Sequence, residues 1–201
     1  MVIEAGQEPI IPGNIISKEL AGAEGCEMEL LVSANPLLHL QGGVDFLLES
    51  PEGNTEYAAS ALLPWLLYDR LAPLCPRLAQ TPADRVRSTV TRSVEQLLSR
   101  QNEDGGLPFW PGAEQSDLWV SAHVAMVLRM AEERGFDLPW PRWYKLLAYL
   151  EKADMQNAGP LTRYEAARAL QNREAQREAL KAALAAMAES QVGGSVRADI
   201  E

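Results

Sequence analysis

The chain has 201 residues, of which 28 are acidic and 18 are Lys or Arg, so its formal charge at neutral pH is −10. A polyanion repels nucleic-acid phosphates and anionic lipid headgroups, and the sequence has no apolar run of about eighteen residues that could span a bilayer. The apolar fraction of 47% is that of a globular protein rather than a disordered one. We therefore expect neither a nucleic-acid partner nor a membrane-spanning segment.

The negative charge is concentrated at the front of the chain. Residues 1–60 hold ten acids and a single base, Lys18, whereas residues 61–201 hold eighteen acids and seventeen bases. The first 25 residues are rich in glycine and proline and show no helical period, so the two parts differ in kind. No basic segment followed by an apolar one opens the sequence, so no signal peptide is expected, and the sequence alone favours the cytosol.

The two cysteines, Cys26 and Cys75, are too few for a disulfide framework and lack the spacing of metal ligands. They are interpreted either as two ordinary thiols or as one disulfide. Sequence alone does not decide between these, because a disulfide requires the two Cα atoms to lie within bonding range.

The strand signal is confined to the front, where residues 28–33 combine short length with the β-branched Val32. From about Asn35 onward the chain reads as a succession of helices separated by glycine or proline. The first of these with a clear period runs from about Asn54 to Leu71. It contains Pro64, which we expect to kink it.

The next helix has a strong start signal. Thr81 is expected to be its N-cap, with Pro82 at the first helical position and Asp84 in the first turn. Four apolar residues then recur at spacings of four, four and three, which predicts one buried stripe: Val86, Val90, Val94 and Leu97.

A later helix, capped by Ser116 or Asp117 and ended by Gly135, is apolar nearly all round. Such a helix belongs inside a helical assembly. Three further helices are predicted at about 141–153, 161–170 and 173–190. Outward-polar and all-apolar helices alternate along the chain, which suggests concentric layers.

No conventional catalytic or metal-binding pattern is found. His39 and His123 have no carboxylate or cysteine at ligand spacing, and His123, on an apolar helix face, is interpreted as a core histidine with satisfied polar atoms. The pair Gly105-Gly106 lacks the lysine and hydroxyl of a phosphate-binding loop. We therefore expect no catalytic residue, no metal ligand and no cofactor.

The turn from Gln101 to Trp110 has glutamine, glycine and tryptophan at spacings similar to those of terpene cyclases and prenyltransferases. The residues that define this toroid loop are Asp104, Gly105, Gly106, Phe109 and Trp110. The resemblance implies an all-α fold, an α/α toroid of paired helices with a short extended N-terminal segment. The proton-donor motif of the cyclases and the zinc ligands of the prenyltransferases are missing, so a toroid enzyme such as a cyclase or glycosidase is the least favoured alternative.

Several segments, taken in order, resemble the thioester domain of bacterial alpha-2-macroglobulins, which are envelope proteins that trap proteases. Residues 35–49 are similar to the helix that leads into the thioester, and residues 53–64 occupy the place of the thioester motif. Residues 104–112, 119–124 and 135–139 keep the family's order and approximate spacing. The match covers residues 35 to about 170, which implies that the preceding residues end a β-rich domain.

The family motif at this place is Gly-Cys-x-Glu-Gln, whose cysteine and glutamine side chains condense into an internal thioester that a lysine of the protease opens. This chain has Asn54 at the cysteine position and Tyr57 at the glutamine position, with Gly53 and Glu56 beside them. Neither an amide nor a phenol can form an acyl–sulfur bond, so the resemblance predicts a degenerate thioester site. Asn54 is expected to cap a helix. Tyr57 is expected to fill the aromatic pocket with its hydroxyl at the rim, or that pocket binds a ligand.

The resemblance predicts three parts: a lead-in over 1–34, a thioester-like α/α toroid over 35–190 and a tail over 191–201. The seven or eight helices that can be placed predict a ring that is incomplete or open. The expected function is that of a non-covalent part of an envelope protease trap, in the periplasm or cell envelope if the chain belongs to a larger exported protein. The expected partners are proteases and other envelope proteins. The alternative is a stand-alone helical scaffold for protein interaction.

Overall fold

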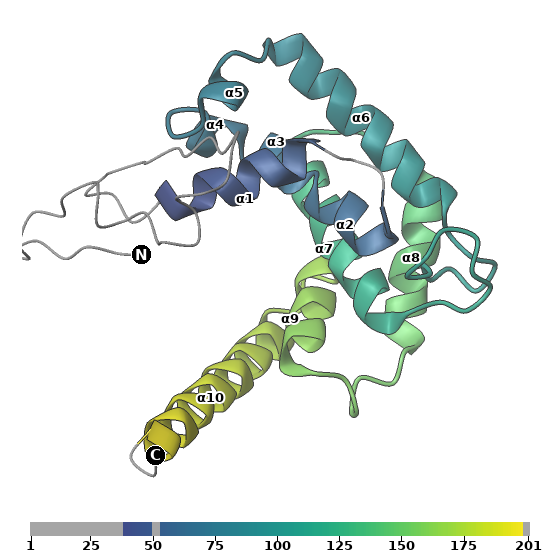
Figure 1. The fold of residues 1–201 in the computed structure, drawn as a ribbon. Helices are drawn as coiled ribbons and strands as arrows, with labels where there is room; N and C mark the ends of the chain where they lie inside the picture. The colour runs from purple at the N-terminus through teal and green to yellow at the C-terminus, as the bar shows by residue number, and fades with distance from the viewer. Residues whose placement is uncertain (1–37, 50–52, 199–201) are drawn as a thin grey trace, which may run out of the picture. The chain divides into compact units, whose positions relative to one another are not determined.

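The computed structural model describes residues 38–49 and 53–198. The chain divides into two units, Met1–Pro36 and Leu37–Glu201, and the described residues belong to the second. They form helices and no strand, so the expected all-α fold is confirmed for this part of the chain (Figure 1). The helices are α1 (Leu38–Glu49), α2 (Thr55–Ser60), α3 (Leu63–Leu66), α4 (Tyr68–Leu71), α5 (Pro76–Ala79), α6 (Ala83–Ser99), α7 (Leu118–Glu133), α8 (Trp140–Lys152), α9 (Pro160–Ala169) and α10 (Arg173–Ala198).

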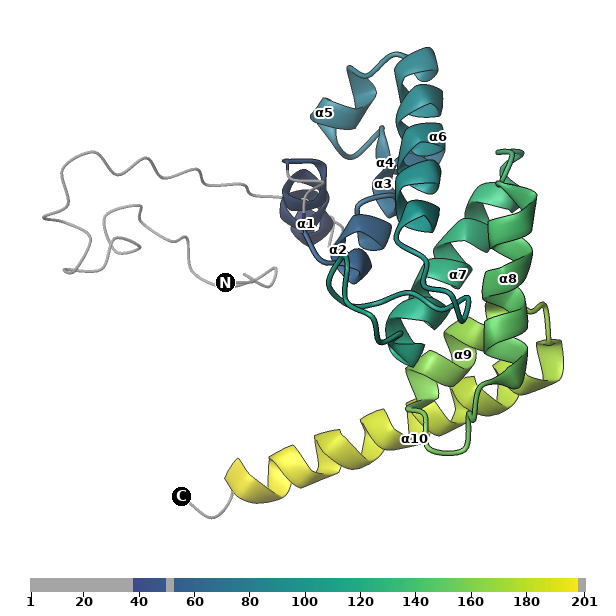
Figure 2. The same ribbon diagram turned by 90° about the vertical axis from the view of Figure 1, so that its right-hand side faces the viewer.

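Helix α7 is the centre of this unit. Nine of its sixteen residues are buried, and it packs against α2, α3, α6, α8 and α9 (Figures 1 and 2). Asp117 caps it by accepting a hydrogen bond from the Val120 amide at 3.0 Å, and Gly135, with φ +78°, follows its last turn. The prediction of a capped internal helix is therefore confirmed, because an all-apolar surface is stable only when helices surround it.

Helix α6 buries the predicted stripe of Val86, Val90, Val94 and Leu97, and the last three of these pack into the same core as α7. Its predicted cap is wrong. Pro82 occupies the N-cap position without a side-chain hydrogen bond, and the Thr81 hydroxyl instead donates to the Arg77 carbonyl at 3.0 Å. The hydroxyl closes the end of α5, and it is therefore not available to the first amides of α6.

The segment from Asn54 to Leu71 is three short helices, α2 to α4, and not the single kinked helix predicted from the sequence. Pro64 stands in the first turn of α3 and has no N–H to donate to the Ser60 carbonyl, so α2 cannot continue through it. Leu67, with φ −100° and ψ 17°, then separates α3 from α4.

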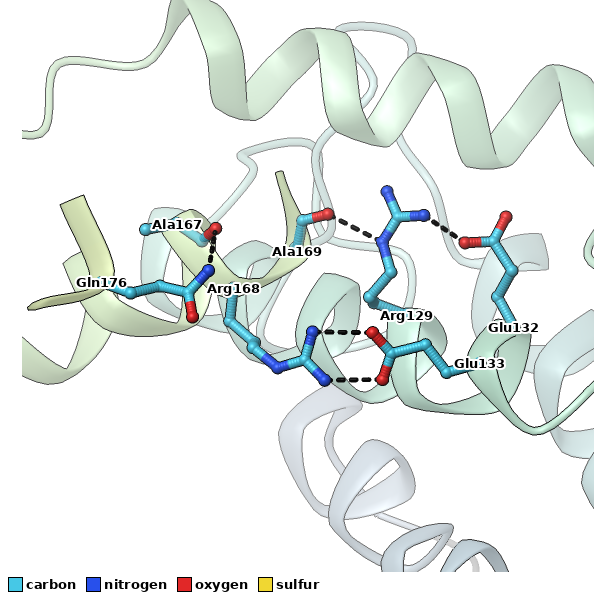
Figure 3. Close-up of polar contacts among 7 residues, drawn as sticks. All are labelled: Arg129, Glu132, Glu133, Ala167, Arg168, Ala169 and Gln176. Carbon is cyan, nitrogen blue, oxygen red and sulfur yellow. Dashed lines mark hydrogen bonds and ion pairs between the residues drawn. The ribbon is translucent and has the colours of Figure 1, made fainter. Parts of the chain in front are cut away.

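Polar contacts fasten α9 to α7 (Figure 3). Arg168 of α9 donates from both terminal nitrogens to the two carboxylate oxygens of Glu133 in α7, at 2.8 and 2.5 Å. Arg129 of α7 donates from Nε to the Ala169 carbonyl at the end of α9, at 2.8 Å. Helix α10 in turn packs against α9 and continues to Ala198, past the end expected near Ser190.

Three features expected from the sequence lie outside the described residues: the strand over 28–33, Cys26 and the side chain of His39. Cys75, at the start of α5, is buried and is a free thiol within the described part of the chain. Burial raises the pKa of this thiol, and Asp45 raises it further. None of the described helices is both long and apolar enough to cross a bilayer.

Candidate functional site at the start of α2

Asn54 caps α2 as predicted. Its backbone is extended, with φ −62° and ψ 171°, and its Oδ1 accepts a hydrogen bond from the Tyr57 amide at 2.7 Å. This contact satisfies one of the amides that a helix start leaves without a partner. The Asn54 side chain, at the position of the family's cysteine, therefore stabilises the start of α2.

Tyr57 lies half-buried between α2 and α1. Its ring meets the Phe46 ring edge to face, with centroids 5.5 Å apart, and its hydroxyl donates to the Phe46 carbonyl at 3.0 Å. Gly53 lies against the same ring, since a Cβ at that position would come within 3.1 Å of Tyr57 Cδ1. The aromatic side chain therefore connects α2 to α1 and packs directly on Gly53.

The toroid loop is built around its two glycines. Gly105 has φ +95°, and a Cβ on it would lie 2.6 Å from the carbonyl oxygen of Lys145. A Cβ on Gly106 would lie 2.6 Å from the Cβ atom of Ser116. Asp104 accepts hydrogen bonds from the Gly106 amide at 2.9 Å and from the Ser116 hydroxyl at 2.7 Å. Only glycine fits at these two positions without displacing the neighbouring chain.

Gln101 fastens the toroid loop to the beginning of α8. Its side-chain amide donates to the Gly105 carbonyl at 2.9 Å and to the Arg142 carbonyl at 3.0 Å. Tyr149 of α8 packs next to Gly106, and the pKa of its phenol is raised by burial and then by the negative charges of Asp104 and Asp117. The glutamine thus ties helix ends together.

A backbone hydrogen bond brings the two predicted groups of site residues together. The amide of Thr55, the first residue of α2, donates to the carbonyl of Phe109 in the toroid loop at 2.8 Å. The Phe109 ring stacks on Trp119 of α7 with centroids 6.5 Å apart, and its edge contacts Trp110, which is 60% exposed. The start of α2 is therefore positioned by the loop that follows α6.

Glu56, the remaining site residue, belongs to a chain of side chains that sequence reasoning missed. Its Oε1 accepts from the Ser60 hydroxyl at 2.8 Å, and Ser60 Oγ lies 3.0 Å from His123 Nε2. On the other side of the ring, His123 Nδ1 lies 2.8 Å from Oε1 of Glu165, which is 4% exposed. The interpretation of His123 as a core residue with satisfied polar atoms is confirmed. Its partner Glu165 lies on α9, and sequence spacing near His123 does not predict this contact.

The chemistry available at this site is limited to hydrogen bonding and packing. Residues 53–57 include no thiol, and no group of three or more metal-binding side chains occurs among the described residues. Thr55 Oγ1 is buried without a partner among the described residues, whereas the side chains of Asn54, Glu56 and Tyr57 are engaged in the hydrogen bonds given above.

The chain is 33% identical over 121 residues to the alpha-2-macroglobulin of Pasteurella multocida and 29% identical over 136 residues to that of Escherichia coli K12. These matches cover 56% and 65% of this chain. The chain is therefore similar in sequence to part of two bacterial alpha-2-macroglobulins. No family model matches it. The alpha-2-macroglobulin-like chain spans only 6% and 8% of the length of these two relatives.

Solved structures share the fold. The structure of Salmonella alpha-2-macroglobulin reacted with methylamine matches 74% of this chain and 11% of its own, with a TM-score of 0.56 and 21% identity. Native E. coli alpha-2-macroglobulin, spanning domain MG7 to the C-terminus, matches 74% of this chain and 26% of its own, with a TM-score of 0.55 and 22% identity. The helices of this alpha-2-macroglobulin-like domain are thus arranged as in part of these proteins.

Proposed function

We propose that this chain is a thioester-less alpha-2-macroglobulin-like domain that works as part of a bacterial envelope protease trap without bonding covalently to the protease. The observation that carries the proposal is the pair Asn54 and Tyr57 in the first turn of α2. A thioester needs a thiolate and an acyl donor, and these two side chains supply neither.

The contacts of Asn54 and Tyr57 support a structural role for these residues in place of thioester formation. Asn54 uses its side-chain oxygen to cap α2, and Tyr57 uses its ring and hydroxyl to hold α1. Cys75 is buried at the start of α5, outside this segment. Under this proposal no residue of the domain is catalytic, and inhibition rests on enclosing the protease.

The wider setting is part of the same proposal. The domain would form an α/α toroid over residues 35–190, follow a β-rich domain and act in the periplasm or cell envelope within a longer protein. Its partners would be proteases, reached through the full-length protein, together with other envelope proteins. Support comes from the similarity to alpha-2-macroglobulins and from the small share of those relatives' length that the chain spans.

Methylamine tests the missing thioester, because a small amine opens an acyl–sulfur bond and remains attached. The intact protein is incubated with methylamine and its mass is measured. We expect no gain, since residues 53–57 offer no cysteine. Salmonella alpha-2-macroglobulin, whose solved structure followed reaction with methylamine, serves as the positive control. A gain of one methylamine by this protein would contradict the proposal.

Trapping itself is tested with trypsin and the full-length protein. We expect trypsin to elute with the protein in size-exclusion chromatography, to retain activity on a small peptide and to lose activity on a large protein substrate. After denaturation in detergent, the two should separate completely. A conjugate that survives the detergent contradicts the non-covalent mechanism, and the absence of co-elution contradicts the trap.

A second candidate function is a helical scaffold that binds a partner protein by itself. It is favoured by exposed aromatic rings on α8, where Trp140 and Tyr144 are 68% and 59% exposed and lie 5.5 Å apart. Aromatic residues are enriched in the centres of protein interfaces. The full reading frame separates the two functions, because β-sandwich domains on both sides would exclude a stand-alone scaffold.

A further inference from the structure

A cleft of about 370 Å³ lies between α6 and helices α1 to α3. One wall is apolar and includes Leu47 and Leu48 of α1 and Trp65 of α3. The opposite wall is polar and comes from one face of α6, with Arg85, Thr89 and Ser93 at spacings of four. A volume of this size is typical of sites for small molecules.

The charge of this cleft is opposite to that of the chain. Arg77 and Arg85 line it, no acidic residue does so among the described residues, and the chain as a whole carries −10. Two other cavities, of about 360 and 740 Å³, have side chains of both signs in their walls. Of the three, the cleft beside α6 is therefore the one whose local field favours an anion.

Two hydroxyls in the polar wall are left for a ligand. Thr89 and Ser93 are half-buried, and neither makes a hydrogen bond to any described residue. The neighbouring serines of α6, Ser88 and Ser99, donate to backbone carbonyls of their own helix. When an occupant fills the cleft, these hydroxyls lose their water. This costs free energy unless the occupant forms hydrogen bonds to them.

We propose that this cleft binds a small amphipathic carboxylate. The carboxylate lies at the end where Arg85 stands, and the aliphatic chain lies against Leu47, Leu48 and Trp65. A guanidinium matches a carboxylate with two parallel hydrogen bonds. Arg77 makes other interactions, so Arg85 is the side chain on which the anion depends. The apolar wall supplies the affinity for the chain by removing methylenes from water.

Calorimetric titration of the intact protein with octanoate tests the anionic end. We expect Arg85→Gln to weaken binding about tenfold or more, because a charged hydrogen-bonding partner is lost. The matched control is Arg92→Gln, which removes an equal charge from a position of α6 that is exposed like Arg85 but lies outside the cleft. We expect the control to change the affinity by less than about twofold. Equal losses in the two variants would overturn the assignment.

Chain length and charge of the probe give a second test on the unmodified protein. Hexanoate, octanoate and decanoate should bind with affinity rising by up to about fourfold per added methylene, as burial against an apolar wall predicts. Octanol, which has the same chain without the charge, should bind more weakly than octanoate. An affinity independent of chain length, octanol binding as tightly as octanoate, or no heat of binding with decanoate would each overturn the proposal.

Discussion

At the scale of single residues, the proton count of the His123 chain limits what it can do. Ser60 has one hydroxyl proton, which it donates to Glu56, so its contact with His123 requires a proton on Nε2. The other ring nitrogen, Nδ1, lies 2.8 Å from Oε1 of the buried Glu165. His123 thus connects Ser60 of α2 to Glu165 of α9 through its two ring nitrogens. It is not arranged as a base that takes a proton from Ser60.

Removing the imidazole should therefore be costly. His123→Ala leaves Glu165 without a partner for either oxygen, since Oε2 already has none among the described residues. Loss of one member of a buried pair costs about 3–5 kcal/mol. We expect a decrease of this size in the free energy of unfolding measured by urea titration.

Ser60→Ala is the matched control at the other end of the same chain. It removes a half-buried hydroxyl and leaves the contact between His123 and Glu165 in place, so the expected cost is about 1 kcal/mol. If His123→Ala costs no more than this control, the pair with Glu165 contributes nothing beyond an ordinary hydrogen bond.

Single residues also show where sequence reasoning succeeds. The cap by Asp117 could be predicted because cap and amide are three residues apart. Thr81 has equally suitable chemistry, yet its hydroxyl bonds backward to α5 because the preceding turn offers a carbonyl within reach. Glu165 lies 42 residues from His123, and their pairing follows from the packing of α9 on α7, which local spacing does not contain.

At the scale of elements, the ion pair between α7 and α9 links stability to pH. The hydrogen bonds from Arg168 lower the pKa of Glu133 below its ordinary value of 4.5, and the same contact raises the pKa of Arg168. Because the folded-state pKa of the carboxyl is lowered, the unfolded chain takes up its proton first as the pH falls. The stabilisation is therefore complete above the ordinary pKa and is lost as the pH falls through the folded value.

Arg168→Gln should remove this part of the acid dependence. Both side chains are partly exposed, at 29% and 40%, so solvent screening limits the expected loss at neutral pH to about 0.2–1 kcal/mol. The measurement is the free energy of unfolding between pH 7 and about pH 3. The variant and the natural protein should converge at the acid end. A difference that persists unchanged at low pH would show that packing, and not the charge pair, is responsible.

Helices α6 and α7 could be predicted from the sequence to within a few residues, because a buried stripe repeats over several of their turns. The segment from α2 to α4 could not, since its apolar residues are compatible with one kinked helix. The missing N–H of Pro64 and the bent conformation at Leu67 end the short helices instead. In this segment, local backbone chemistry overrides the periodic pattern.

At the scale of the whole molecule, the negative charge and most of the helices belong to different parts of the chain. Residues 61–201, which include most of the helices, hold eighteen acids and seventeen bases, so their formal charge is close to zero. The all-α fold and the similarity to alpha-2-macroglobulins could be predicted from the sequence. Closure of the helices into a toroid stays a prediction. The cleft beside α6 could not be predicted, because its walls come from helices that are far apart in the sequence.

The length of α10 has a consequence for the order in which the fold opens. Its first turns are held by α9, through the buried Ala179 and the hydrogen bond from Gln176 to the Ala167 carbonyl at 3.2 Å. Farther along, Leu180 and Leu184 are 50% and 58% exposed. Amide protons of α10 beyond about residue 184 should exchange with deuterated solvent many times faster than those of α7, because a helix with little tertiary packing is only marginally stable. Mass spectrometry of deuterium uptake should therefore detect opening at this helix first, and equal protection of α7 and the end of α10 would show that another part of the protein covers it.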